Sequence, residues 1–189
     1  MNWCVGGAQI PAPGERVCGD GYRVIPGEGG VLVAVVDGLG HGPFAKEAAD
    51  AFLQFVDGHP HLPLEEMITK GGRAVAATRG VAATLARLGE GRIEFLGVGN
   101  VRVVARTRRP FHAVPVPGIV GALHRQPRLA VGAVEPGDVF VFCTDGISPT
   151  ERLPGGVARA TVSQLAEAFL AAADKRQDDA TVVVARAGA

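Results

Sequence analysis

The residues with the clearest chemical potential are aspartates placed beside glycine at the ends of apolar segments. They are Asp20 within GDG, Asp37-Gly38 after VLVAVV, Asp145-Gly146 after VFVFCT, and Asp178-Asp179 before ATVVVA. A strand end holds a side chain more rigidly than a free loop, and an adjacent glycine lets backbone or ligand approach closely. Aspartates gathered at one edge repel one another unless cations neutralise them. Because hard divalent cations such as Mg²⁺ or Mn²⁺ take oxygen ligands, the set predicts a metal site.

Asp-Gly pairs are also common in turns, so any single pair is better explained as structural than as catalytic. Asp57-Gly58 is interpreted as a helix end and Gly137-Asp138 as a turn entering a strand. Asp37 differs, because its turn DGLGHG has glycine at every second position and then starts a helix. That design is suited to bringing backbone close to a bound ion or phosphate.

The segments that must position these aspartates are predicted to be short strands rich in Val, Ile and Phe. They lie at 17–25, 31–36, 80–88, 92–98, 101–106, 139–144 and 180–186. The connection Gly89-Glu90-Gly91 predicts a hairpin between the strands that flank it. A second hairpin is predicted at Asn100, which is suited to turning the chain into VRVVAR.

Three helices are predicted from apolar residues at helical spacing. The first starts after Gly42-Pro43, ends near Asp57-Gly58, and places on one face Phe44, Ala48, Ala51, Phe52, Phe55 and Val56. The second starts near Pro63, although Gly71-Gly72 in its middle costs roughly 1 kcal/mol per glycine relative to alanine. The third, with Thr161 as a possible N-cap, carries the stripe Val162, Leu165, Ala166, Phe169, Leu170 and Ala173. Antiparallel strands with grouped helices predict an α+β layered domain.

Composition excludes several other classes of protein. The 189 residues, 47% of them apolar, are enough for one sizeable core, and we expect a single domain over 1–189. The 19 basic and 19 acidic residues leave no net charge, which gives no sign of a nucleic-acid or anionic-membrane partner. Three widely spaced cysteines fit neither a disulfide framework nor a CxxC metal site. With no signal peptide or membrane-length apolar run, we expect a cytoplasmic protein.

The set of motifs and its order resemble the metal-dependent protein phosphatases of type 2C. The segments that carry the resemblance are CGDGY at 18–22, VVDGLGHG at 35–42, VGNVR at 98–102, VPGIVG at 116–121, CTDGI at 143–147 and RQDDAT at 176–181. They span nearly the whole chain and are most similar to the small bacterial regulatory phosphatases of the SpoIIE group. The resemblance implies a four-layer αββα sandwich, two antiparallel sheets flanked by helices, with a metal site at one end between the sheets.

The resemblance also implies roles for individual residues. Asp37 corresponds to the carboxylate that bridges two Mn²⁺ or Mg²⁺ ions, and Gly38 would contribute its carbonyl oxygen. Asp145 and Asp178 correspond to the carboxylates that complete one metal, and Asp20 to the acidic ligand on the other side. We therefore expect Asp37 and Asp20 to be catalytic. Two such cations lower the pKa of a shared water, so that a bridging hydroxide attacks phosphorus in line.

Four further residues have weaker parallels in the family. Asp179 is expected to support the metal ligands from outside the coordination shell, and Asn100 to hydrogen-bond the metal aspartates, although asparagine also suits a turn. Arg16, four residues before Asp20, stands where larger relatives carry a phosphate-binding arginine, but an exposed arginine is an equal explanation. The fourth residue is His41, which lies in the turn after Asp37.

The sequence departs from the family pattern directly after Asp37-Gly38. Many type 2C phosphatases have there a histidine that protonates the leaving oxygen, whereas this chain has Leu39. His41, two residues later, either compensates or faces solvent. A thiol phosphatase is disfavoured, because no Cys-x5-Arg loop follows Cys18 or Cys143, which we expect to be buried structural thiols.

The resemblance implies that the partners are phosphorylated STAS-domain proteins of the stressosome, a bacterial stress-signalling complex. Three hypotheses stay open at this stage. They are an active phosphoserine/phosphothreonine protein phosphatase, a pseudophosphatase that binds a phosphorylated partner without turnover, and a metal-dependent hydrolase of small phosphate esters. Retention of all four candidate carboxylate ligands argues against the pseudophosphatase.

Overall fold

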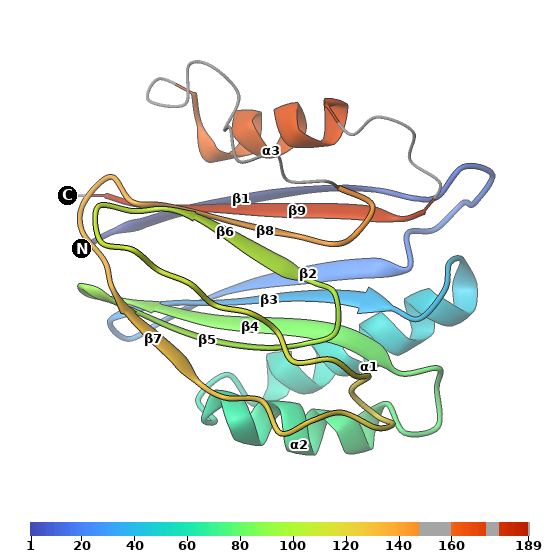
Figure 1. Cartoon of the computed structure of the whole chain (residues 1–189). Coiled ribbons are helices and arrows are strands. Elements are labelled where there is room, and N and C mark those ends of the chain that lie inside the picture. Colours follow the sequence, from blue (N-terminus) through green and yellow to red (C-terminus); the bar gives the residue numbers. More distant parts are fainter. Residues whose placement is uncertain (148–159, 173–177, 189) are drawn as a thin grey trace.

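The computed structural model describes residues 1–147, 160–172 and 178–188, and within them the chain forms two antiparallel sheets (Figure 1). One sheet has the order β2-β3-β4-β5-β7, with strands Asp20–Gly27, Gly30–Gly38, Val81–Gly89, Arg92–Val98 and Ala130–Ala133. The other has the order β1-β9-β8-β6, which are, in that order, Trp3–Ile10, Ala180–Ala187, Val139–Cys143 and Arg102–Arg106.

Helices cover the outer faces of both sheets. The helices α1 (Pro43–Gly58) and α2 (Leu64–Ala74) lie on the larger sheet, and α3 (Val162–Ala171) lies on the smaller one (Figure 1). Each helix buries one apolar stripe against its sheet, as the periodicity predicted. The predicted four-layer αββα sandwich of the α+β class is therefore confirmed. None of the described helices is long and apolar enough to cross a membrane.

The central strand β3 is buried on both faces, which explains its unbroken apolar run. Val33 and Val35 pack into the core between the two sheets, where Phe140 and Phe142 of β8 meet them. The alternate residues of β3 face α1 and α2 and join a second core; they are Leu32, Ala34 and Val36. The inward face of β3 thus ends in Asp37, the next residue of the Val33 and Val35 series.

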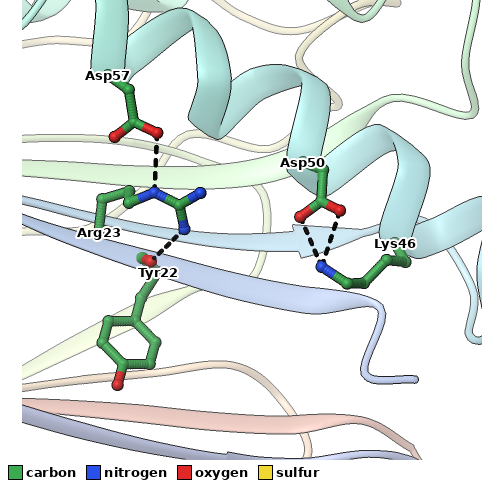
Figure 2. Close-up of polar contacts among 5 residues, drawn as sticks. All are labelled: Tyr22, Arg23, Lys46, Asp50 and Asp57. Carbon is green, nitrogen blue, oxygen red and sulfur yellow. Dashed lines mark hydrogen bonds and ion pairs between the residues drawn. The ribbon is translucent and has the colours of Figure 1, made fainter. Parts of the chain in front are cut away.

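Helix α1 starts where the turn after Asp37 ends. Gly42 has φ +74°, a conformation that favours glycine, and Pro43 occupies the first turn of the helix. The far end of α1 is attached to β2, because Arg23 Nε donates to Asp57 Oδ2 at 2.9 Å (Figure 2). Asp57-Gly58 is therefore the helix end that the sequence predicted.

The exposed face of α1 carries a further ion pair, in which Lys46 Nζ contacts Asp50 at 2.6 Å (Figure 2). The predicted apolar face of this helix is wrong at one position. Phe44 is 63% exposed, whereas Ala48, Phe52 and Val56 are buried. The reason is that Phe44 lies in the first turn, beyond the edge of the sheet that the helix covers.

The elements agree with most of the predicted ranges. The hairpin of β4 and β5 through Glu90 and Gly91 is present. The hairpin predicted at Asn100 is wrong, because β5 and β6 belong to different sheets and the chain crosses between them there. Helix α2 runs through Gly71-Gly72, and Thr161 forms a capping box with Gln164 at the start of α3. Ala173, predicted on the α3 stripe, lies outside the described residues.

Candidate metal centre between the two sheets

The predicted aspartates meet at one end of the space between the sheets. Residues two apart in a strand point to the same face, so Asp37 continues the inward face of Val33 and Val35. Asp20 is the partner of Asp37 in the pairing of β2 with β3. Both carboxylates are therefore brought from the larger sheet to the same edge of the inter-sheet core.

The smaller sheet supplies the opposing side of the site. Thr144 follows β8 and continues the inward face of Phe142, and its hydroxyl donates to Asp20 Oδ2 at 2.7 Å. The same hydroxyl oxygen accepts from the backbone N–H of Thr181 at 2.9 Å. A contact between residues 124 positions apart in the sequence thus joins the two sheets at the site.

Asp20 is almost fully buried, with 2% of its surface exposed. Burial, and then the neighbouring charge of Asp37, raise the pKa of Asp20 from 3.8 to about 8. The hydrogen bond from Thr144 opposes this rise, because it stabilises the ionised carboxylate. Asp20 is therefore shielded from water, and the charge of Asp37 disfavours its ionised form.

Asp37 is half-buried, and the pKa of its carboxyl is shifted in the same direction. Burial, followed by the charge of Asp145, raises its pKa to about 7, and Asp178 and Asp179 add smaller contributions in the same direction. A hydrogen bond from Asn100 acts in the opposite sense. The electrostatic coupling shows that aspartates from both sheets act on Asp37, since Asp145 follows β8 and Asp178 precedes β9.

The outer part of the cluster is held by local hydrogen bonds. Asn100, at the crossover from β5 to β6, donates from Nδ2 to Asp145 Oδ2 at 2.7 Å. The carboxylate of Asp178 accepts from the backbone N–H of Asp179 at 2.8 Å. Asp145 is exposed and Asp178 is partly exposed, so this side of the cluster is open to solvent.

Asp179 lies deeper than Asp178. One carboxylate oxygen, Oδ1, accepts from the backbone N–H of Ala12 at 2.9 Å. The other, Oδ2, is buried and has no hydrogen-bond partner among the described residues. A buried carboxylate oxygen without a donor is costly unless a cation or water meets it.

Glycines beside the aspartates allow close backbone packing. A Cβ on Gly38 would collide with the backbone carbonyl of Ala45 in α1, and one on Gly146 with the carbonyl of Asp179. A Cβ on Gly19 would lie 2.6 Å from Asp179 Oδ2. The Asp-Gly pattern therefore reflects contacts between elements at the site.

The chemistry of this donor set fits divalent cations. Among the described residues no group of three or more His, Cys, Asp or Glu is already gathered in a metal-binding arrangement. Mg²⁺, however, is commonly held by one or two carboxylates with several waters. A bound cation would offset the repulsion between these carboxylates, whose pKa values are raised. It would also provide a partner for Asp179 Oδ2, which has none among the described residues.

The remaining predicted site residues lie around this cluster. His41 is exposed, and its Nδ1 contacts Glu15 Oε1 at 2.6 Å. Arg16 is exposed in the loop before β2. Leu39, which stands where the family often has histidine, is 44% exposed. None of these three side chains forms a hydrogen bond to an aspartate of the cluster in the described chain.

The cysteines behave as the sequence predicted. Cys18 and Cys143 are buried, and burial raises the pKa of each thiol to about 12. A thiol with such a pKa stays protonated at neutral pH and is a poor nucleophile. A thiol phosphatase mechanism at either residue is therefore disfavoured.

Sequence reasoning missed two residues at this end of the molecule. Thr144 lies inside the quoted motif CTDGI, and the only available signal was its place directly before Asp145. Arg79, in the connection between α2 and β4, lies against the loop that follows Asp37, with Nη1 3.5 Å from the carbonyl of Leu39. Nothing in its sequence surroundings indicated this contact.

Comparison with known proteins gives several similar chains, although no protein-family model matches. The phosphoserine phosphatase RsbX of Bacillus subtilis (strain 168) is 23% identical over 180 residues, which are 93% of this chain and 90% of RsbX. A protein solved in a study of the bacterial stressosome as a modular system adapted to control secondary messenger signalling is 30% identical. It has a TM-score of 0.91 and covers 98% of this chain and 100% of its own.

Two solved structures contain metal. RsbX in complex with magnesium is 22% identical, with a TM-score of 0.85 over 97% of this chain and 94% of RsbX. The catalytic domain of the serine/threonine protein phosphatase PstP with two manganese ions is 16% identical, with a TM-score of 0.76 over 99% of both chains. At these identities the two structures support the fold.

Fold, motif order and comparisons agree on one class. The chain belongs to the metal-dependent protein phosphatases of type 2C. Within that family it is similar to the phosphoserine phosphatase RsbX.

Proposed function

We propose that this chain is a phosphoserine/phosphothreonine protein phosphatase that removes phosphate from STAS-domain proteins of a stressosome, acting in the cytosol. The observation that carries the proposal is the convergence of Asp20, Asp37, Asp145, Asp178 and Asp179 from two sheets on one edge of the inter-sheet core. The similarity to RsbX and to the stressosome-related structure supports the choice of partner.

Two divalent cations, Mn²⁺ or Mg²⁺, would neutralise the phosphoryl oxygens and acidify a water when bound. We assign Asp37 to both ions, with the Gly38 carbonyl beside it. Asp145 and Asp178 would complete one ion, and Asp20 would serve the other. This assignment places the buried Asp20 innermost and the solvent-exposed Asp145 at the entrance.

The chain's own residues keep these carboxylates in place. Thr144 donates to Asp20 and Asn100 donates to Asp145, so each carboxylate has a fixed orientation before any ligand arrives. The N–H of Ala12 fixes one oxygen of Asp179. These contacts reduce the reorganisation that binding would otherwise require.

His41 is given no proton-transfer role in this proposal. Its Nδ1 is engaged by Glu15 at 2.6 Å, which orients the ring along the loop before β2. Leu39 has no proton to give. We infer that the leaving serine or threonine oxygen takes its proton from water, which the exposed side of the cluster admits.

The proposal is tested by release of inorganic phosphate from a phosphorylated STAS-domain stressosome protein, with Mn²⁺ present and then chelated. We expect Mn²⁺-dependent release that falls by more than about 100-fold in Asp37→Asn, because Asp37 is assigned to both ions. Asp57→Asn is the matched control, since Asp57 is paired with Arg23 at the far end of α1.

Each other outcome contradicts part of the proposal. Tight binding of the phosphoprotein without phosphate release would indicate a pseudophosphatase. Equal rates on p-nitrophenyl phosphate and on the phosphoprotein would indicate a hydrolase of small esters, because a protein phosphatase gains binding energy from contacts remote from the phosphate.

A further inference from the structure

Two apolar side chains are left on the surface directly beside the aspartate cluster. Leu39 follows the Asp37-Gly38 pair and is 44% exposed, and Phe44 in the first turn of α1 is 63% exposed. Leu39 lies in the loop that connects β3 to α1, and Phe44 lies at the start of the helix that follows this loop. Large apolar side chains exposed together next to a site of chemistry are typical of surfaces that bind another protein.

An arginine is held over the same loop. The guanidinium carbon of Arg79 lies 5.1 Å from the centre of the Phe44 ring, in a cation–π contact. Nη1 approaches the Leu39 carbonyl at 3.5 Å and would lie 2.8 Å from a Cβ on Gly40. The backbone of the two segments is joined as well, because the N–H of Leu39 donates to the carbonyl of Gly80 at 3.2 Å.

Arg79 carries a positive charge at this surface. No carboxylate of the described residues forms an ion pair with it, and its side chain is exposed. The aspartate cluster nearby would repel a phosphate dianion. A cation fixed at the rim of that cluster is therefore complementary to the phosphorylated group of a substrate.

Resting on the proposed function, we propose that Leu39, Phe44 and Arg79 form the docking surface for the folded phosphoprotein substrate. Arg79 faces the phosphoryl group or its immediate surroundings, where its planar guanidinium can donate two hydrogen bonds. Leu39 and Phe44 contact apolar surface of the partner beside the phosphorylated residue. The partner is thus a folded protein with an apolar patch next to its phosphoserine or phosphothreonine.

A neighbouring turn extends this surface. The 87% exposed Leu123 belongs to a turn in which the N–H of Ile119 donates to the Leu123 carbonyl. A Cβ on Gly80 would lie 2.6 Å from Ile119 Cγ2, so the turn packs against the residue that follows Arg79. This arrangement adds exposed apolar area next to the segment of Arg79 and Gly80.

The test measures the dissociation constant of a STAS-domain stressosome protein, phosphorylated and unphosphorylated, by calorimetry in an Asp37→Asn background. Adding Arg79→Ala is expected to raise the Kd of the phosphorylated form about tenfold and to change the unphosphorylated form little, because only the former carries the extra charge. Adding Phe44→Ala is expected to raise both Kd values about tenfold, because it removes apolar contact.

Matched controls lie at the opposite end of the molecule. Arg108→Ala removes an exposed arginine next to the Arg106 end of β6, and Val131→Ala removes a half-exposed apolar side chain from β7. Neither is expected to change either Kd. Because Arg79 and Phe44 are exposed, their truncation leaves the cores intact, and thermal melting checks that each variant is folded.

The outcomes separate the two proposals. If protein with Asp37 intact releases phosphate while Arg79→Ala and Phe44→Ala leave both Kd values unchanged, the docking surface is wrong and the function stands. If no phosphate is released but Arg79→Ala still weakens binding of the phosphorylated form alone, the docking surface stands and the function is wrong. Equal effects of the control variants would also overturn the docking surface.

Discussion

Asp20 and Asp37 carry the same charge on neighbouring strands, where Asp20 is buried and Asp37 is half-buried. Their pKa values, raised to about 8 and about 7, mean that ionising them works against folding when no cation is bound. Elsewhere in the chain, buried polar groups are mostly neutral or hydrogen-bonded, as with Thr84, whose hydroxyl donates to the Val101 carbonyl. The aspartates therefore carry a local electrostatic cost, which a bound cation would offset, as the proposed function requires.

The first prediction concerns Asp37→Asn in the metal-free protein. A carboxyl whose folded pKa is raised stabilises the fold while it is protonated, and this contribution is lost as pH rises from about 4 through about 7. The amide does not ionise, so we expect the variant to melt several degrees above the unmodified protein at pH 8 with chelator present, and close to it at pH 4. Calorimetry at the two pH values measures the difference.

Asp57→Asn provides the comparison, because Asp57 is exposed and paired with Arg23. It should give no stabilisation at pH 8. A variant at Asp37 that melts at or below the temperature of the unmodified protein at pH 8 would show that the carboxylate is not under electrostatic strain.

At the scale of elements, α2 contains two adjacent glycines with opposite surroundings. Gly71 faces α1, and a Cβ there would lie 2.6 Å from the ring of Phe52. A Cβ on Gly72 would meet nothing closer than 3.4 Å, an ordinary contact distance. Close packing of α2 against α1 therefore requires glycine at one position only.

The second prediction follows from this pair. Gly72→Ala should raise the free energy of unfolding by roughly 0.5–1 kcal/mol, because alanine restricts the unfolded chain and favours helix. Gly71→Ala should lower it by about 1–3 kcal/mol through overpacking against Phe52. Denaturant unfolding of the two variants measures the difference, and a loss of stability in Gly72→Ala would contradict the account.

The elements that the sequence did not predict have physical reasons. β1 carries Gly6 and Gly7, which lower strand propensity but let Ser163 of α3 and Tyr22 of β2 approach closely. β7 has only four residues and pairs only at one end of β5. Both are edge strands, whose formation depends on distant partners and leaves little periodic signal.

The candidate site was more accessible to sequence reasoning than these edges. Strand alternation and the position of each aspartate at a strand end were visible in the sequence, as with Asp37 after VLVAVV. The contact between Asp20 and Thr144 was not visible in the sequence, because it depends on how the two sheets pack against each other. The exposure of Phe44 was missed for the same reason, since helical spacing does not show where a sheet ends.

At the scale of the whole molecule, the site joins two sheets that otherwise meet through an apolar core. Asp20 and Asp37 belong to the larger sheet, and Asp145 and Asp178 lie at the ends of strands of the smaller one. At this end, the described hydrogen bond from Thr144 to Asp20 links them directly. A cation shared by ligands from both sheets would add a second link and relieve the charge repulsion between them.

The third prediction is that Mn²⁺ stabilises the whole fold. A ligand at about 100 times its Kd adds about 2.7 kcal/mol to the free energy of unfolding, which corresponds to roughly 5–10 °C in Tm for a chain of this size. Hydrogen exchange should slow in β2, β3, β8 and β9 together, because the ion ties their ends. Asp37→Asn should abolish both effects, whereas Asp57→Asn should retain them. Protection confined to one sheet would mean that the ion is held by that sheet alone, and the assignment of Asp37 to ions shared across the two sheets would then be wrong.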